Sequence, residues 1–532
     1  PNFRQGDAII LYERNSDTDN VTNKMVFKGN IEYLTENEIG IRLRATQQNP
    51  SVLPAESLYA IEHDTMDTTF RSMYQGLYIY LSARKERRDL LLSQRPPRFD
   101  ESLDSMISRS EDDFTRIALK AKAAQDYFLL IGPPGTGKTS CALKKMVETF
   151  HADKDAQILL LSYTNRAVDE ICKSLASIAP AVDFIRVGSE LSCDEAYRGH
   201  LIENELSSCN RRSEVYERIR NCRIIVGTVA AISGKPELFR LKHFDVAIID
   251  EATQILEPQL LGILCARGED GKDAIDKFVL IGDHKQLPAV VQQNTEQSAI
   301  YDESLLSIGL TNLKDSLFER LYRNCTATVH RSYDMLCRQG RMHPEVALFA
   351  NRAFYGGRLI PVGLPHQIES SDTICRLAFY PSVPEKAGAS AKINYSEARI
   401  VADLAVRIYE DHQTDFDESR TLGIITPYRS QIALIKKEIE SVGIPVLNRI
   451  LVDTVERFQG SERDVIIYSF CVNYPYQLKF LSNLTEEEGV LIDRKLNVAL
   501  TRARKQMFIT GVPELLERNP LYKSLLKLIE GS

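Results

Sequence analysis

YFLLIGPPGTGKTS, residues 127–140, decides how the surrounding chain folds. Its first five residues are apolar and have the length of a strand buried on both faces. The next eight match G-x-x-x-x-G-K-[ST], and a helical pattern follows over 141–150. Glycines let backbone N–H groups turn towards a phosphate chain, and the helix N-terminus adds a positive dipole. A glycine-rich turn that binds nothing is the alternative, but the full motif between strand and helix favours a nucleoside triphosphate site.

Two side chains of this loop have defined roles in phosphate chemistry. Lys138 can reach the β and γ phosphates, and the Thr139 hydroxyl can bind Mg²⁺. The expected cofactors are therefore ATP and Mg²⁺. The residues that we expect to contact the nucleotide in this stretch are Gly132, Pro134, Gly135, Thr136, Gly137, Lys138, Thr139 and Ser140.

The composition is that of an ordinary globular protein, with 43% hydrophobic and 26% charged residues among 532. The net charge of −7 does not indicate a nucleic-acid-binding protein, so such a site would have to be a local basic groove. Ten cysteines without a C-x-x-C pair favour reduced thiols in an intracellular protein, either cytoplasmic or nuclear. No apolar run has transmembrane length, so we expect no membrane contact. The chain begins with Pro, which suggests a piece of a longer protein.

The order of apolar runs predicts four regions. We expect a small antiparallel β-barrel over 1–65 and a helical stalk over 66–109. Strands alternate with helices over 110–296, interrupted by a polar, helix-prone insertion at 189–221, and a second such series occupies 297–532. The predicted buried strands are 127–131, 157–163, 223–228, 245–250 and 277–282 in the first series, and 374–380, 422–428, 464–470 and 506–511 in the second.

Adjacent carboxylates end one of these strands, in DEATQ (250–254). Asp250 at the carboxyl edge of the strand would hold Mg²⁺, and Glu251 would orient and deprotonate the attacking water. Asp283 and Gln286 follow the next strand, where Gln286 can report the γ-phosphate. The second series supplies Arg341 and Arg502, because charge on a transferring phosphoryl group requires cations, often from a neighbouring domain.

A set of motifs in this order resembles the superfamily-1 helicases. The set is GPPGTGKT, YTNRAVDE (163–170), DEATQ, GDHKQLP (282–288), GRMHP (340–344), TPYRSQ (426–431), VDTVERFQGSERD (452–464) and NVALTRAR (497–504). More narrowly, it is similar to the 5′→3′ branch with the nonsense-mediated-decay RNA helicase and the Okazaki-fragment nuclease-helicase. The resemblance implies an α/β fold of two tandem RecA-like parallel-sheet domains, with the β-barrel and stalk before them.

The resemblance also implies roles for single residues. Lys138, Asp250, Glu251, Gln286, Arg341 and Arg502 would be catalytic, with Thr139 and Asp250 holding the metal. Glu462 would touch the ribose or the arginine network. The residues that would line a groove for a nucleic-acid strand, across both domains, are Thr164, Asn165, Thr228, Pro427 and Thr454.

The function implied is an ATP-dependent helicase or translocase that moves 5′→3′ on a single strand, and we expect it to be monomeric. One alternative is an ATPase that clamps strands or displaces proteins without unwinding, and another is a P-loop protein unrelated to nucleic acid. DNA is favoured over RNA because residues 68–100 resemble the nuclease-helicase more closely. A nuclease or other domain upstream of this chain is a further expectation.

Base recognition is where the chain departs from these relatives. Their adenine contacts come from a glutamine upstream of the phosphate loop and an aromatic residue before the arginine finger. The corresponding positions are Thr115 and Gly340. A glycine has no ring to stack and a threonine cannot make paired amide contacts, so we predict weak discrimination between bases. Alternatively, another ring, Tyr428 being the nearest by motif, restores adenine preference.

Overall fold

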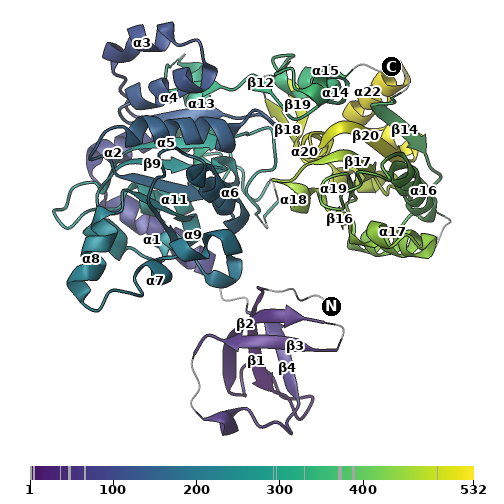
Figure 1. Ribbon diagram of the computed structural model, residues 1–532, viewed down its shortest axis with the longest axis horizontal. Coiled ribbons are helices and arrows are strands. Elements are labelled where there is room, and N and C mark those ends of the chain that lie inside the picture. Colours follow the sequence, from purple (N-terminus) through teal and green to yellow (C-terminus); the bar gives the residue numbers. More distant parts are fainter. Residues whose placement is uncertain are drawn as a thin grey trace.

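The computed structural model describes the chain except for residues 1, 2, 4, 5, 36, 46–48, 65–67, 292, 295, 329, 370–373, 386–389, 488 and 532. Two α/β lobes lie side by side, and a small β-module lies apart from both of them (Figure 1). The predicted class, α/β with two parallel RecA-like sheets and an N-terminal antiparallel module, is confirmed. None of the described helices is both long and apolar enough to cross a membrane.

The N-terminal module is a four-stranded antiparallel sheet in the order β3-β2-β1-β4. Ile9, Tyr12, Phe27 and Ile31 are buried in it, as expected for strands with one covered face. None of the described pairings joins the edge strands β3 and β4, so the described strands of the module form an antiparallel sheet whose closure into a barrel stays a prediction. Its strands are β1 (Ala8–Glu13), β2 (Val26–Leu34), β3 (Ile39–Leu43) and β4 (Tyr59–His63).

The predicted stalk packs against the first lobe. Helix α1 (Thr68–Ser82) crosses α11 (Glu257–Leu264) closely, since a Cβ on Gly76 would lie 2.2 Å from the Pro258 carbonyl oxygen. Further along, α2 (Lys85–Leu91) contributes Leu90 and Leu91 to the core of that lobe. The expected boundary at 65/66 lies outside the described residues. Shorter helices, η2 (Glu101–Leu103) and α3 (Asp104–Arg109), lead into the lobe.

The first lobe is built on seven parallel strands in the order β11-β5-β10-β9-β6-β8-β7. Five are the predicted strands, whereas β7 and β11 are not among them. The strands are β5 (Tyr127–Ile131), β6 (Ile158–Ser162), β7 (Phe184–Val187), β8 (Ile224–Thr228), β9 (Phe244–Ile249), β10 (Ile275–Gly282) and β11 (Tyr333–Met335). Helices that cover the sheet include α4 (Asp113–Ala123), α5 (Lys144–His151), α6 (Asn165–Ala176), α9 (Val229–Ser233) and α10 (Glu237–Leu241).

The predicted insertion at 189–221 is helical. It contains η4 (Glu190–Ser192), η5 (Glu195–His200), α7 (Ile202–Glu205) and α8 (Arg212–Asn221).

The expected boundary between the lobes at 296/297 is wrong. Strand β11 pairs in parallel with β5, and α13 (Leu317–Ala327) packs Leu317, Phe318 and Leu321 into the core of the first lobe. The first lobe therefore extends to residue 335. The sequence suggested an earlier end because a polar segment precedes α13, and the short α12 (Glu303–Ser307) is the one helix among its described residues.

The second lobe has five parallel strands in the order β14-β20-β17-β15-β16. Four match predicted strands, and the three-residue β16 does not. The strands are β14 (Leu377–Pro381), β15 (Leu422–Ile425), β16 (Leu451–Asp453), β17 (Arg463–Ser469) and β20 (Ala503–Gly511). The helices are α14 (Pro344–Tyr355), α15 (Pro365–Ile368), α16 (Tyr395–Asp411), α17 (Arg429–Val442), α18 (Val455–Phe458), α19 (Leu478–Leu481), α20 (Arg494–Leu500), α21 (Pro513–Leu516) and α22 (Pro520–Glu530). Two small paired elements complete the lobe, β12 (Arg338–Gln339) with β13 (Ile360–Pro361), and the hairpin β18 (Leu484–Glu487) with β19 (Val490–Asp493).

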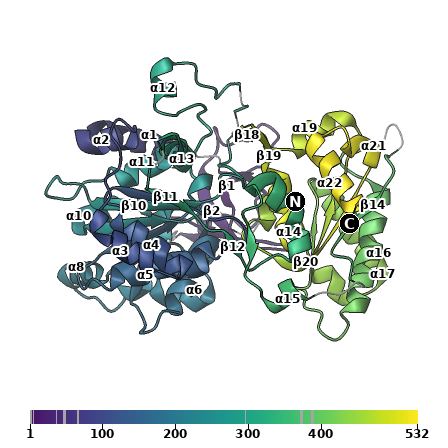
Figure 2. The ribbon, with the colours of Figure 1, turned by 90° about the horizontal axis from the view of Figure 1, so that it is seen from above.

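The segment after β10 joins the lobes. Leu287 packs in the core of the second lobe, and the Tyr355 hydroxyl donates to Asp283 over 2.7 Å. The Asn497 amide donates to the Lys285 carbonyl over 2.7 Å. A second link is the buried ion pair of Glu319 on α13 with Arg494 on α20, with 2.5 Å between Oε1 and NH2. Figure 2 shows these lobes from above, with the β-module beneath them.

Candidate nucleotide site between the lobes

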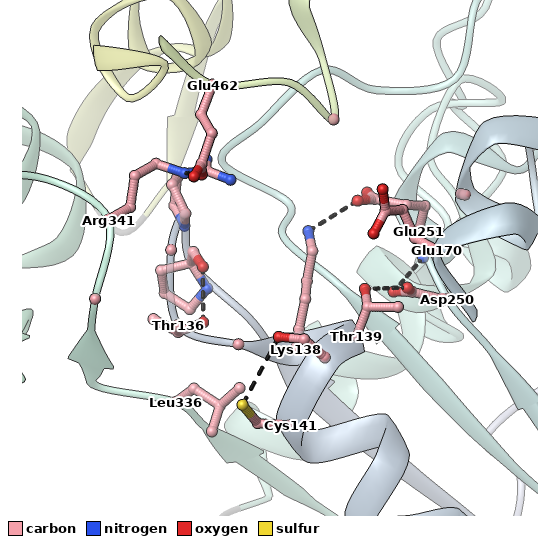
Figure 3. A pocket seen from close by; sticks show the side chains of 18 of the residues that line it. Thr136, Lys138, Thr139, Cys141, Glu170, Asp250, Glu251, Leu336, Arg341 and Glu462 are labelled. Atoms are coloured by element: carbon pink, nitrogen blue, oxygen red, sulfur yellow. Dashed lines mark hydrogen bonds and ion pairs between the residues drawn. The ribbon is translucent and has the colours of Figure 1, made fainter. Parts of the chain in front are cut away.

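The phosphate loop leaves β5 and enters a helical turn at Lys138–Leu143 that continues into α5. Gly135 and Gly137 have φ of +73° and +75°, a left-handed conformation that favours glycine. A Cβ at Gly135 would also lie 2.4 Å from the Cβ of Arg341 in the second lobe. The Gly340 N–H donates to the Gly135 carbonyl over 2.8 Å. The loop is therefore held in shape by its own glycines and lies directly against the second lobe (Figure 3).

A cavity of about 1020 Å³ opens over this loop between the two lobes. Of the residues predicted for nucleotide chemistry, Gly132 does not line it, because the loop's wall begins at Pro133. The predicted residues that do line it are Pro134, Gly135, Thr136, Gly137, Lys138, Thr139, Ser140, Asp250, Glu251, Gln286, Arg341, Glu462 and Arg502. Residues far apart in the sequence are thus brought to one cavity.

The acidic pair lies opposite the loop lysine. Lys138 Nζ is 3.0 Å from Glu251 Oε1, and Gln254 donates to Glu251 Oε2 over 3.0 Å. Glu251 has a φ of 54°, which is rare for a residue other than glycine and is typical of backbone held in place at a functional site. The strand end therefore turns Glu251 into the cavity, while Asp250 points towards the loop (Figure 3).

The charges of this cluster depend on one another. Burial by itself lowers the pKa of Lys138, but the carboxylates of Glu251, Asp250 and Asp283 outweigh it and raise that pKa. Burial favours neutral Glu251, yet the ammonium of Lys138 lowers its pKa. For Asp250, burial and the charge of Glu251 raise the pKa. An added cation would stabilise the ionised form of Asp250.

The oxygen atoms of Thr139 and Asp250 fit a magnesium ion. Thr139 Oγ1 donates to Asp250 Oδ2 over 2.6 Å, so a hydroxyl and a carboxylate oxygen lie together at the floor of the cavity. Hard oxygen ligands of this kind, completed by phosphate oxygens and water, are those that Mg²⁺ takes in nucleotide sites. These two residues would hold the ion.

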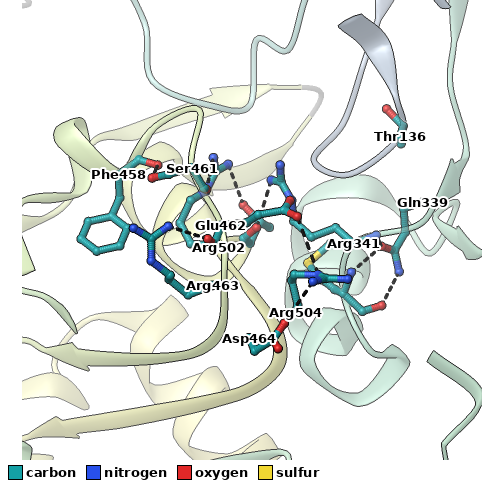
Figure 4. Close-up of polar contacts among 12 residues, drawn as sticks. Thr136, Gln339, Arg341, Phe458, Ser461, Glu462, Arg463, Asp464, Arg502 and Arg504 are labelled. Carbon is teal, nitrogen blue, oxygen red and sulfur yellow. Dashed lines mark hydrogen bonds and ion pairs between the residues drawn. The ribbon is translucent and has the colours of Figure 1, made fainter. Parts of the chain in front are cut away.

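The second lobe contributes two guanidinium groups. Arg341 Nε donates to Glu462 Oε2 over 2.5 Å, and Arg504 Nε lies 3.7 Å from Glu462 Oε1, so Glu462 faces the arginine network (Figure 4). Arg502 is only 2% exposed and donates from NH2 to Gln286 Oε1 over 3.2 Å. Burial and the positive charge of Arg341 lower the pKa of Arg502 to about 9, which leaves it mainly cationic at neutral pH.

Several cavity residues were missed by the sequence analysis. They include Arg166, Glu170, Lys173, Gln254, Glu456 and Gln459. Of these six, all except Lys173 lie inside the quoted motifs YTNRAVDE, DEATQ and VDTVERFQGSERD, so membership of these motifs was the available signal for them, whereas Glu111, Asp112, Asp113 and Arg338 lie in no quoted motif. Lys173 lies on α6, one helical turn after Glu170, and follows no motif.

The two positions predicted for base recognition differ in whether they line the cavity. Gly340 lines it, and a Cβ there would lie 3.2 Å from Leu364 Cδ1. Thr115 does not line it, because its hydroxyl and N–H both bind the Asp112 carboxylate at the start of α4. Tyr428 is also absent from the wall, since its hydroxyl accepts a bond from Gln477 instead. The cavity wall also has apolar side chains at Phe114, Leu336, Val362 and Leu364, and charged ones at Glu111, Asp112, Asp113 and Arg338.

The predicted strand-groove residues follow the carboxyl ends of β6, β8, β15 and β16. Thr164 is exposed and lines the nucleotide cavity, and its hydroxyl accepts from Ala167 N as the cap of α6. Thr228 caps α9 in the same way and is 8% exposed. A hydroxyl that accepts a capping bond retains its own proton, which it can donate to a phosphate oxygen. Asn165, Pro427 and Thr454 lie at equivalent strand ends and are partly buried.

Comparisons with known proteins agree with this arrangement. Two family models, each described as an AAA domain, match residues 109–215 with 202–294, and residues 313–514. The chain is 28% identical to the DNA replication ATP-dependent helicase/nuclease JHS1 of Arabidopsis thaliana, covering 99% of this chain and 38% of that protein. It is 28% identical to the helicase/nuclease DNA2 of Homo sapiens, covering 90% of this chain and 46% of that protein.

A third relative is the DNA polymerase alpha-associated DNA helicase A of Saccharomyces cerevisiae, 24% identical over 86% of this chain and 73% of that protein. Among solved structures, an arterivirus nonstructural protein 10 helicase in complex with DNA has a TM-score of 0.38 and 16% identity, covering 76% of this chain and 65% of that one. The chain spans less than half the length of the DNA2-type relatives it matches.

The two sheets, the phosphate loop and the arginines opposite it define a P-loop protein with two RecA-like lobes. Within that class, the chain belongs to the superfamily-1 helicases, in the branch of the DNA2-like proteins.

Proposed function

We propose that the protein hydrolyses ATP to move 5′→3′ along a single nucleic-acid strand, with DNA favoured over RNA. The observation that supports this most directly is the division of one cavity between two lobes. The first lobe supplies Lys138 and the Asp250–Glu251 pair, and the second supplies Arg341 and Arg502. A nucleotide bound between the lobes would favour the closed arrangement, and its hydrolysis would favour opening.

In the proposed mechanism, the ammonium group of Lys138 exchanges its ion pair with Glu251 for one with the γ-phosphate of the bound nucleotide. Glu251 then accepts a proton from the attacking water, while the ammonium stays on the phosphate oxygens. Arg341 and Arg502 exchange their present acceptors, Glu462 and Gln286, for the charge that develops on the transferring phosphoryl group. Mg²⁺ on Thr139 and Asp250 supplies further positive charge when it is bound.

The preference for DNA is supported by the relatives, whose names state that they are DNA replication or DNA helicases. Their larger size also supports a nuclease or other domain beyond this chain in the complete protein. Movement along a strand would use Thr164 and Thr228 on one lobe and Pro427 and Thr454 on the other, because closure changes the distance between these two sets.

A comparison of ATP hydrolysis with single-stranded DNA, single-stranded RNA and neither tests the proposal. We expect strong stimulation by DNA, and Lys138→Ala as the matched inactive control. A translocase moving 5′→3′ displaces streptavidin from a 3′-biotin and not from a 5′-biotin. Stimulated hydrolysis without displacement from either end, and without unwinding, would instead favour a strand clamp. Hydrolysis that no strand stimulates would exclude both.

The salt dependence of strand binding gives a second measurement. If the groove neutralises about five phosphates, log affinity should fall with log salt at a slope of roughly −3.5. A flat response would show that a nucleic-acid backbone is not what the groove holds.

A further inference from the structure

A short segment of the second lobe, residues 473–481, carries exposed aromatic rings that none of the motifs includes. It follows β17 and contains η8 (Pro475–Gln477) and α19. The side chain of Tyr476 is 55% exposed and that of Phe480 is 70% exposed. Exposed apolar side chains that cluster on a surface often mark an interaction site.

Hydrogen bonds of a buried glutamine hold the backbone of this segment in place. Gln477 is 2% exposed and accepts bonds from the Asn473 and Tyr474 N–H groups over 2.9 and 3.0 Å. Its amide group donates to the Ala391 carbonyl over 2.7 Å and to the Tyr428 hydroxyl over 3.1 Å. Leu481 anchors the other end in the core. The backbone that carries the exposed rings is therefore held in place, so little backbone entropy would be lost when the rings bind a ligand.

The geometry of the rings suits stacking. Tyr474 and Tyr476 already stack, with centroids 5.7 Å apart and planes at 14°. Lys479 lies between Tyr476 and Phe480 in the chain and is exposed. In the part of the chain that the structure describes, no carboxylate lies within ion-pair distance of Lys479. Flat rings with an uncompensated ammonium complement a strand that has bases and phosphates.

The position of the segment connects it to the proposed groove. Tyr428, which Gln477 contacts, directly follows Pro427, and β17 lies beside β15 in the sheet. The segment thus leaves the same edge of the sheet as the groove residues Pro427 and Thr454. Figure 2 draws α19 and α15 on opposite sides of the second lobe. Leu364, the residue before α15, lines the nucleotide cavity. Strand and nucleotide would not compete for space there.

We propose that Tyr476 and Phe480 form a base-stacking platform for a single nucleic-acid strand, with Lys479 contacting its phosphates. The inference rests on the proposed function, because it assigns a place on the second lobe where the translocated strand is gripped by its bases. Stacking does not distinguish the four bases, so the platform would add affinity without sequence preference.

Equilibrium binding of two probes tests this. One is an oligothymidylate, and the other is an abasic strand with the same number of phosphates. Since stacking of each base is sequence-tolerant and substantial, we expect the wild-type protein to bind oligothymidylate about tenfold or more tightly than the abasic strand. The double variant Tyr476→Ala, Phe480→Ala should lose most of this ratio while its affinity for the abasic strand stays unchanged.

Matched variants separate stacking from charge and from simple apolar contact. Lys479→Ala should weaken both probes by the same factor. Tyr476→Phe with Phe480→Tyr keeps two rings and should retain the ratio, whereas Tyr476→Leu with Phe480→Leu should lose it. ATP hydrolysis without a strand should be the same in all of them, which shows that the exposed substitutions leave the fold intact.

Three results would overturn the inference. The first is a wild-type protein that binds both probes equally, and the second is a double alanine variant that binds oligothymidylate like the wild type. The second result would point to a protein partner for these rings. The third is a wild-type protein that binds neither probe, which would also refute the proposed function. Strand binding and stimulated hydrolysis with no base-dependent ratio would refute the platform alone.

Discussion

Each of the two lobes buries a carboxylate beside its parallel sheet, but the groups that contact the carboxylate differ in charge. In the first lobe, Glu251 faces a cavity with its charge matched by Lys138. In the second lobe, Glu397 is 0% exposed and is held by neutral donors, the Ser469 hydroxyl over 2.6 Å and the Cys471 N–H over 2.8 Å. Among the described residues, no lysine or arginine pairs with it. Glu251 thus keeps its charge beside a cation, whereas Glu397 has only neutral donors and its burial favours the protonated form.

The difference extends to what each lobe gives the nucleotide. The first lobe presents its charges on the loop and strand ends of its own sheet, so they are preorganised within one rigid body. The second lobe presents Arg341 and Arg502, and their distance from the phosphate loop depends on how the lobes meet. We expect substitutions in the first lobe to affect chemistry alone and those in the second to affect chemistry and closure together.

The largest expected effect is the loss of a guanidinium from the second lobe. Arg502→Ala should lower strand-stimulated turnover on the order of a thousandfold or more, because no other group replaces its charge in the transition state. Arg341→Ala should have a similar effect, and neither should change strand affinity much. Arg504→Ala is a matched control, since its guanidinium pairs with Asp464 over 3.1 Å and should change turnover only slightly. Unaltered turnover in either arginine variant would remove that residue from the mechanism.

The next effect is the loss of the proposed base in the first lobe. Glu251→Gln should retain ATP binding, because Thr139, Asp250 and Lys138 remain, while single-turnover hydrolysis falls by about two to four orders of magnitude. Binding is measured with a fluorescent nucleotide and hydrolysis by quenched flow. Gln254→Ala, which removes only the donor to Glu251, is the milder control. Hydrolysis near the wild-type rate in Glu251→Gln would show that another group activates the water.

A smaller effect concerns selection of the nucleotide's base in the cavity between the lobes. Gly340 offers no ring to stack on adenine and Thr115 does not line the cavity, so catalytic efficiency with GTP should be within about tenfold of that with ATP. The measurement is kcat/KM for the four triphosphates in the presence of a single strand. Phe114→Ala should raise KM for both purine nucleotides by the same factor. An ATP preference above about a hundredfold would mean that other residues of the cavity recognise adenine.

The last effect concerns stability rather than turnover, and it sharpens the contrast between the two buried carboxylates. Burial raises the pKa of Glu397 to about 7 from an ordinary value of 4.5, so the folded protein holds a proton that the unfolded chain releases. Its contribution to stability is complete below pH 4.5 and is lost as the pH rises towards 7, by about 1.4 kcal/mol per pH unit.

Urea unfolding followed from about pH 5 to about pH 8 measures this. The wild-type protein should lose more stability over that range than Glu397→Gln, which stays neutral throughout. The difference between the two curves removes the contribution of other titrating groups, Asp250 included. Parallel curves would mean that Glu397 is ionised in the folded protein.

The sequence by itself determined the parts whose physics is local. The phosphate loop, Asp250 and Glu251 could be predicted because glycines, a buried strand and a helix start are consecutive in the chain. Long apolar runs likewise predicted nine strands of the two parallel sheets. The arginines rested on a resemblance, because residue chemistry alone does not say which surface cation will face a distant loop.

Only the tertiary structure decided the rest. The strands β7, β11 and β16 have only three or four residues, and each is a strand because it pairs with a neighbouring strand of the sheet. For this reason the sequence did not place β11 in the first lobe, where it pairs with β5. The pairing of Glu319 with Arg494, the burial of Glu397 and the exposure of Tyr476 and Phe480 depend on which segments meet in space. A strand of three or four residues is too short to show a hydrophobic period, and the burial of a single side chain has no sequence pattern at all. Both are stabilised by contacts between residues far apart in the sequence, so they could not be predicted from it.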